Sequence, residues 1–169
     1  MTDSAPLPLT RPVAVTTVRA DGLAYHVETT EAERIALAER FDIPSIARLT
    51  ADFVLRKKGP HIRVTGVVTG TFTQTCILTL DPFESDFKEE VDIGFDEDPA
   101  KALELRPDEE APDQIVDGII DVGAIAAEFT ALALDPYPRK PGAVFDFVDK
   151  KDVEIEKPAP FGALATLKQ

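Results

Sequence analysis

The chain of 169 residues lacks tryptophan and contains only one cysteine, Cys76. A single cysteine excludes a disulfide bond within the chain and any zinc site that needs several cysteines. The sequence also lacks a run of about 18 apolar residues, so we expect no transmembrane helix. The first dozen residues have none of the apolar character of a secretory signal. These absences favour a cytoplasmic protein.

The motifs of the common enzyme classes are missing as well. Neither glycine-rich phosphate-binding motif occurs, and neither do HExxH and GxSxG. His26 and His61 lie outside any motif, and the residues next to Cys76 supply no cation that would lower the pKa of its thiol. We therefore expect Cys76 to be a buried strand thiol. We also expect no catalytic residue, no cofactor and no bound metal.

Basic residues are scarce in the middle of the chain. The net charge is −13, and residues 81–135 contain 18 acidic but only 3 basic residues, while the segments on either side are close to neutral. Such a dense negative charge repels the phosphates of RNA and attracts basic proteins. An acidic stretch that serves only solubility has the same composition, so both interpretations stay open.

The spacing of apolar residues predicts an α+β domain: a mainly antiparallel sheet of about five strands, with two helices and an acidic loop. Within the strand expected over residues 61–75, Gly66 and Gly70 predict a bulge or a close approach of two backbones. Residues 76–80 are expected to continue the extended chain. The expected strands, of which the first two form a hairpin, are residues 12–18, 23–27, 48–56, 61–75 and 83–95.

Two helices are predicted, over residues 30–41 and 121–134. Thr30 and Glu33 have the spacing of a capping box at the first helix, and Asp121 is suited to cap the second. The expected inward stripes are Ala32, Ile35, Ala38 and Phe41 in the first helix and Val122, Ile125, Phe129 and Leu132 in the second.

The expected organisation is one domain with two extensions. Residues 1–11 form a flexible N-terminus, residues 12–145 a single domain, and residues 146–169 a C-terminal tail. Inside the domain, residues 96–113 form the acidic loop, whose charge opposes ordering. The tail carries a short apolar motif in which Phe161, Leu164 and Leu167 recur at every third residue.

Three segments together resemble the YceD family, the large ribosomal RNA subunit accumulation proteins. The first is a glycine-bearing strand, residues 64–76, that leads to Cys76 and Leu80. The second is the entry to the second helix with its Leu- and Pro-rich end, residues 117–138. The third is the terminal Pro-Phe-x-x-Leu-x-x-Leu-Lys pattern of residues 160–168. Residues 135–142 are similar to the variant found in alphaproteobacterial members.

The resemblance implies a factor in the processing or accumulation of large-subunit ribosomal RNA, with no known catalytic residues. Family genes often lie beside a gene for a large-subunit ribosomal protein, which suggests a partner. Many relatives carry a Cys-x-x-Cys where this chain has Cys76 and Thr79, and some have a further cysteine later. A metal or redox role of those cysteines therefore does not carry over to this chain.

Our first hypothesis is a factor that contacts a basic large-subunit ribosomal protein or a pre-ribosomal particle through the acidic segment. The terminal apolar motif would dock in a groove of the partner, or pack on its own domain. The candidate partner-binding residues are Asp117, Gly118, Asp121, Asp135, Pro136, Phe161, Leu164 and Leu167.

Two alternatives stay open. One is direct binding of ribosomal RNA by the cations of a strand turn, Arg56, Lys57, Lys58 and Arg63, although solvated turn residues explain them too. The other is a metal-dependent hydrolase that uses Asp117, Asp121 and Asp135. Roles in turns and helix caps explain these three residues without catalysis.

Overall fold

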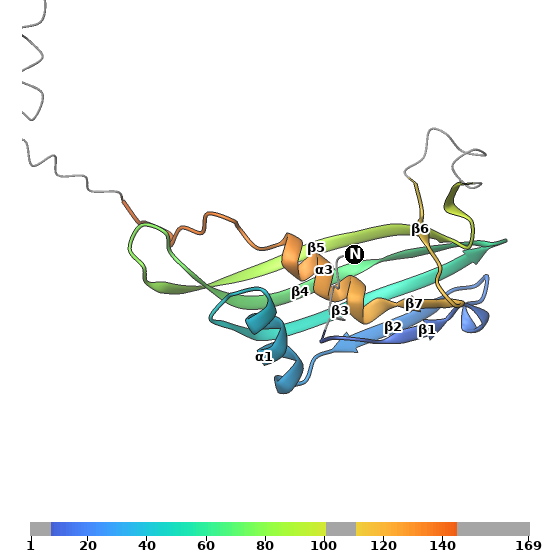
Figure 1. Ribbon diagram of the computed structural model, residues 1–169, viewed down its shortest axis with the longest axis horizontal. Helices are drawn as coiled ribbons and strands as arrows, with labels where there is room; N and C mark the ends of the chain where they lie inside the picture. The colour runs from blue at the N-terminus through green and yellow to red at the C-terminus, as the bar shows by residue number, and fades with distance from the viewer. Residues whose placement is uncertain (1–7, 101–110, 145–169) are drawn as a thin grey trace, which may run out of the picture.

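A computed structural model describes residues 8–100 and 111–144 of the chain (Figure 1). Its main sheet has the strand order β2-β3-β4-β5-β6, and every pairing is antiparallel except that of β6 with β5. This arrangement confirms the predicted α+β class. The strands are β2 (Leu23–Glu28), β3 (Ser45–Lys58), β4 (His61–Thr75), β5 (Pro82–Asp96) and β6 (Asp113–Gln114).

The close backbone approach predicted at the two glycines of β4 is confirmed. A Cβ at Gly66 would collide with the carbonyl oxygen of Asp52, and one at Gly70 would lie 2.5 Å from that of Arg48. The ring of Phe87 on β5 also lies against Gly70. Larger residues at either position would force β3, β4 and β5 apart, so the glycines allow the three long strands to pack closely.

The predicted hairpin of the first two strands is wrong. The short strand β1 (Pro12–Ala14) pairs with β7 (Ile119–Asp121), whereas β2 pairs with β3. A 3-10 turn, Val15–Thr17, follows β1 and ends the predicted strand early. Alternating β-branched residues indicate a strand but do not identify its partner, and here the partner lies more than a hundred residues away.

Helix α1 (Glu31–Arg40) begins as predicted, with both hydrogen bonds of the capping box between Thr30 and Glu33 in place. Its predicted inward stripe is only half right. Ala38 is buried, but Ile35 is 54% exposed and Leu37 is completely buried. The inward face is therefore rotated by part of a turn, because α1 packs against β3 and leaves its other side in solvent.

Helix α3 (Val122–Leu132) begins at the predicted cap, Asp121. Val122 and Ile125 are buried as predicted, whereas Leu132 is 73% exposed. The buried face consists mainly of small residues, Gly123, Ala126, Ala127 and Thr130. Small side chains let the helix lie close to the sheet. The inward face therefore differs from the one predicted from the spacing of large apolar residues.

Residues 76–80 do not continue the extended chain, as the sequence predicts, but form the tight turn between β4 and β5. The Leu80 amide donates to the Cys76 carbonyl, and the Cys76 amide donates to the Asp81 carbonyl, both at 2.9 Å. Leu80 has a φ of 60°, a conformation that the sequence gives no reason to expect of a leucine.

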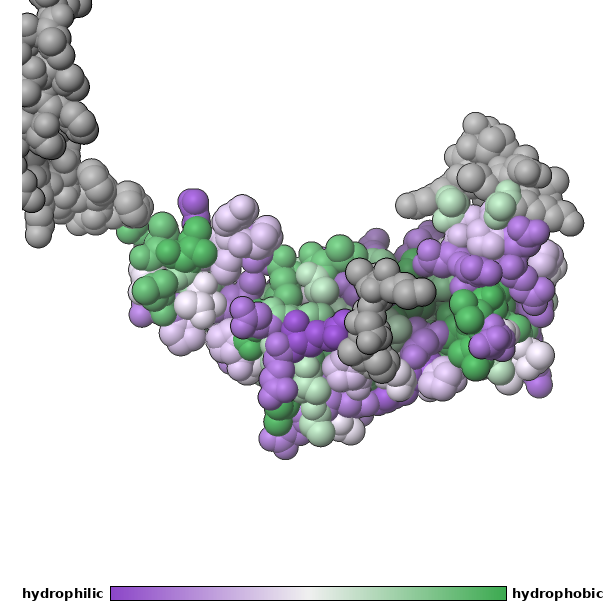
Figure 2. All heavy atoms as spheres, viewed as in Figure 1, coloured by the Kyte–Doolittle hydropathy of each residue, from purple (hydrophilic) through white to green (hydrophobic). Residues whose placement is uncertain are grey.

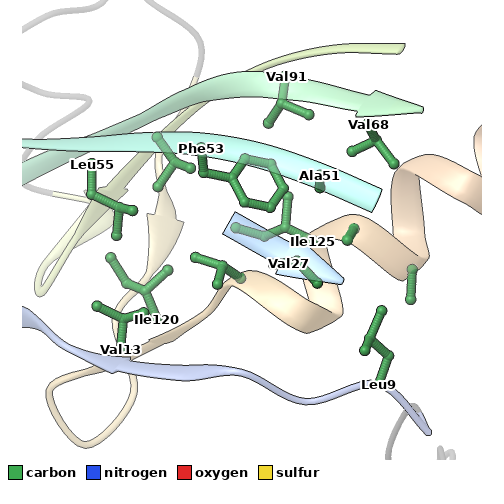
Figure 3. Close-up of a cluster of buried hydrophobic side chains, with 14 of the residues drawn as sticks. Leu9, Val13, Val27, Ala51, Phe53, Leu55, Val68, Val91, Ile120 and Ile125 are labelled. Atoms are coloured by element: carbon green, nitrogen blue, oxygen red, sulfur yellow. The ribbon is translucent and has the colours of Figure 1, made fainter. Parts of the chain in front are cut away.

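The core lies between the helices and one face of the sheet. Figure 3 shows side chains from β2, β3, β4, β5 and α3 meeting those of Leu9, Val13 and Ile120. The opposite face of the sheet carries polar side chains and is covered by no other described element. The predicted flexible N-terminus is described only from Pro8 onward, where Leu9 is completely buried.

Arg11 joins the N-terminal segment to both helices. Its amide donates to the Asp121 carboxylate at 2.7 Å, and its carbonyl accepts from Val122 at 3.1 Å. Its guanidinium forms two hydrogen bonds with Glu33, of 2.8 and 3.1 Å. The hydrogen bonds from Arg11, together with those from Thr30, hold the pKa of Glu33 at about 2.

We expect the fold to lose stability in acid as the Glu33 carboxylate becomes protonated. A carboxylate whose pKa is lowered by folding, here from 4.5 to about 2, stabilises the protein fully above its unfolded pKa. That contribution is lost as the pH falls toward the folded pKa. Urea unfolding of the wild type and of Glu33→Gln at about pH 6 and about pH 3 measures the difference.

The variant keeps a capping side chain without the charge. Its free energy of unfolding should therefore fall less between the two pH values than that of the wild type. Equal losses in both proteins would contradict this role of Glu33.

Candidate partner-binding surfaces

Asp117 and Gly118 are the central residues of the turn that leads into β7. Both have a positive φ, 53° and 69°, and the Ile119 amide donates to the Val116 carbonyl at 3.0 Å. Asp-Gly is favoured in two-residue turns of this geometry. The Gly118 carbonyl accepts from the Val15 amide at 2.9 Å. The predicted turn is confirmed, and a partner contact at these residues stays a prediction.

The side chain of Asp121 joins two parts of the fold. One oxygen of its carboxylate accepts from the amides of Arg11, Gly123 and Ala124, at 2.7, 2.9 and 3.1 Å. The side chain thus caps α3 and anchors the segment before β1 in the same place. This arrangement explains Asp121 without a partner or a metal.

Asp135 and Pro136 belong to a segment that runs from the end of α3 along the β4–β5 turn. The Asp135 carbonyl accepts from the side-chain amide of Gln74 at 2.9 Å, and the Pro138 carbonyl accepts from the Ile77 amide at 2.9 Å. Pro136 itself is exposed. The structure therefore fixes this segment to the end of the sheet that lies farthest from the β3–β4 turn.

The same end of the molecule exposes large apolar side chains, which we call the apolar tip: Ile77, Leu80, Tyr137 and Val144. Their exposed fractions are 44%, 76%, 70% and 80%. Figure 2 shows hydrophobic residues gathered over the β4–β5 turn and the segment after α3. The sequence does not predict the tip, because it indicates extended chain at residues 76–80, where the structure has the tight turn that exposes Leu80.

Cys76 lies beneath the apolar tip and is completely buried. Hydrogen bonds from the Lys140 backbone and the Thr79 hydroxyl lower the pKa of the Cys76 thiol to about 7. The sequence next to Cys76 supplies no cation, but the fold brings the backbone of Lys140 to it from 64 residues away. Its burial is as predicted, although it follows β4 and does not lie in a strand.

The four predicted RNA-contact residues lie together at the β3–β4 turn. Arg56, Lys57, Lys58 and Arg63 all line one cavity of about 460 Å³. Arg56 and Arg63 stand directly opposite each other on β3 and β4. Arg63 also pairs with Asp92 on β5 through two hydrogen bonds of 2.5 and 2.6 Å, which lower the pKa of that carboxyl group.

Strand β5 forms an acidic, open edge of the sheet. Among the described residues, only Phe95 and Asp96 pair on the side of β5 away from β4, with β6, so residues 82–94 have no strand on that side. The open part carries one basic residue, Lys88. Its acidic residues are Glu84, Asp86, Glu89, Glu90 and Asp92.

A cavity of about 520 Å³ lies where the open edge meets β6. It is lined by two apolar residues, two acidic residues, two basic or imidazole residues and two small ones: Ile93, Phe129, Asp92, Asp113, Arg63, His61, Gly94 and Ala111. Glu128 on α3 lies near enough to Asp113 that the two charges repel, and burial and this repulsion raise the pKa of Glu128. The sequence predicted neither the edge nor the cavity, because strand order determines both.

The three residues of the hydrolase hypothesis do not converge. Asp117 lies in a turn, Asp121 caps the start of α3, and Asp135 follows its end. A helix of 11 residues alone separates the last two by roughly 16 Å. Within the described residues, no group of three or more potential ligands is arranged to hold a metal ion.

We expect Asp121→Ala to lower the free energy of unfolding by about 1–2 kcal/mol, because three backbone amides lose their acceptor. Asp121→Ser, which keeps an oxygen at the cap, should retain most of the stability. Asp135→Ala is the matched control and should cost less than Asp121→Ala, because the exposed Asp135 carboxylate accepts from only one amide, that of Tyr137 at 2.8 Å. Urea unfolding measures all three, and an unchanged stability of Asp121→Ala would contradict the capping role.

None of the helices in residues 8–100 and 111–144 has the length and apolarity of a membrane span.

Comparisons with known proteins agree with the three segments singled out in the sequence. No curated protein and no solved structure gives a match. The family model described as "Large ribosomal RNA subunit accumulation protein YceD" matches residues 64–168, which is more than half of the chain. The match runs from β4 through α3 and the tail, and its description names a role in ribosomal RNA accumulation and no catalytic activity. The chain therefore belongs to the YceD family of large ribosomal RNA subunit accumulation proteins.

Proposed function

We propose that this protein supports the accumulation of large-subunit ribosomal RNA without catalysis, by contacting a basic large-subunit ribosomal protein or a pre-ribosomal particle. The observation that carries this proposal is the open edge of β5, a strand that carries five carboxylates and one lysine and has no described strand on its outer side over residues 82–94. Complementary charge speeds the encounter with a basic partner and selects against other partners.

The location of the acidic residues supports the proposal more than their number does. Glu84 and Glu90 are exposed, and no ion pair neutralises them within the described residues. They lie on a long, regular strand, which holds the charges in a row. A stretch kept only for solubility needs no such order.

The two ends of β5 differ in a way that suits a protein partner. The strand begins beside the apolar tip, so a partner that follows the edge would meet exposed apolar side chains as well as charge. The terminal motif of Phe161, Leu164 and Leu167 lies outside the described residues. Its role as a docking motif, like a partner contact by Asp135 and Pro136, is part of the proposal.

Direct binding of ribosomal RNA is the second candidate. It is favoured by the cavity in which Arg56, Lys57, Lys58 and Arg63 come together, since four cations at one place suit phosphate groups. The same cavity lies beside acidic β5, and Arg63 is already paired with Asp92. The negative field of the neighbouring strand weakens this candidate relative to the first.

The contact with a basic partner predicts a salt-sensitive complex. Pull-down of the tagged full-length protein from cells should recover a basic large-subunit ribosomal protein or precursor particles at low salt and far less at high salt. Glu84→Lys with Glu90→Lys should reduce that recovery at least about tenfold. Each close charge pair that is lost contributes of the order of a tenfold change in affinity.

Glu28→Lys with Glu39→Lys is the matched control. These residues are exposed on β2 and α1, and the variant changes the net charge by the same amount. Its recovery of partner should stay within about twofold of the wild type. An equal loss in both variants would mean that net charge, and not the β5 edge, governs binding.

The RNA alternative predicts a different set of sensitive residues. If the protein binds RNA directly, charge reversal of Arg56, Lys57 and Lys58 should weaken its affinity for purified large-subunit RNA at least tenfold and lower the salt dependence. The β5 variant should then bind RNA as well as the wild type or better. We expect instead that purified RNA binds weakly and that neither variant changes the affinity by more than about threefold.

A further inference from the structure

We infer that the open edge of β5 binds an extended basic segment of a protein as an added strand, and that a lysine or arginine of this segment enters the cavity beside Asp113. The inference deepens the proposed function, since it gives the contact a mode and the partner a conformation. It rests on that function only for the identity of the partner.

The backbone of β5 provides the first part of the argument. Alternate N–H and C=O groups of residues 82–94 point away from β4, and no described strand accepts them. An unpaired edge of this length, roughly 40 Å, offers main-chain hydrogen bonds to an extended peptide. The pairing of Phe95 and Asp96 with β6 shows that the same side of β5 does accept a strand.

The charges on the edge decide what kind of strand it accepts. A second copy of this chain would place the carboxylates of Glu84, Asp86 and Glu90 against the same carboxylates, which destabilises a sheet. Glu89 points to the inner face near the edge, and an inward charge of this kind also discourages self-association. A basic strand has neither difficulty, because its cations neutralise the row of carboxylates.

The cavity at the end of the open edge suits a long basic side chain. Ile93 and Phe129 offer an apolar wall for its methylene groups. Arg63 also lines the cavity but is paired with Asp92, whereas Asp113 is exposed, forms no ion pair among the described residues and repels Glu128. A cation beside Asp113 would relieve that repulsion, so the site favours lysine or arginine over a neutral side chain.

The test uses the full-length protein and a ten-residue peptide that alternates lysine and valine. Two further peptides carry backbone N-methyl groups on all lysines or on all valines, which removes one set of N–H donors and leaves the charge unchanged. In a strand only one set faces β5. We expect one methylated peptide to lose more than about tenfold in affinity and the other to bind within about threefold of the parent.

Protein variants test the cavity. Asp113→Lys should weaken the parent peptide about tenfold, while Glu39→Lys, the same charge change on α1, should alter its affinity less than about twofold. Equal binding of both methylated peptides, or equal effects of the two variants, would overturn the added strand or its cavity respectively. The methylation result needs no altered protein and therefore does not depend on how a variant folds.

The outcome is separable from that of the proposed function. If the methylated peptides bind equally but the pull-down recovers a basic large-subunit protein, the proposed partner is supported and the added-strand mode of binding is wrong. If the peptides differ as expected but no such protein or particle is recovered, the edge binds basic strands and the ribosomal partner is wrong.

Discussion

The structure depends on the crossing of the segment before β1 over the start of α3. The Arg11 backbone exchanges hydrogen bonds with Asp121 and Val122, while its guanidinium holds Glu33 at the start of α1. The crossing is possible because residue 123 is a glycine, whose absent Cβ would lie 2.7 Å from the Arg11 nitrogen. One residue thus places both helices on the same face of the sheet.

Because both helices pack on one face of the sheet, the other face and the β5 edge are exposed to solvent. The outer face carries polar side chains and needs no cover. The edge is different, since its backbone groups have no described partners over residues 82–94. Natural sheets protect such edges with charge, and here five of the six charged residues are acidic. Protection against self-association and selection of a basic partner then follow from the same side chains.

Local features could be predicted from the sequence because they are encoded by neighbouring residues. The capping box of Thr30 and Glu33, the cap at Asp121 and the long strands all depend on spacing within one element. Features that depend on distant segments could not. The pairing of β1 with β7, the Lys140 backbone beside Cys76 and the open edge of β5 are set by strand order, which periodicity does not contain. The inward face of each helix was predicted only in part, because packing against the sheet decides it, and in α3 this packing favours small residues over large apolar ones.

The central claim is that the β5 edge is the surface that meets a basic partner of the large subunit. Hydrogen exchange of the full-length protein, measured alone and with purified large-subunit precursor particles, tests it directly. The account predicts slower exchange of backbone amides between residues 82 and 94, with little change in β2 and α1. Slower exchange confined to the β3–β4 turn, with β5 unchanged, would contradict the account and indicate contact through the basic cavity.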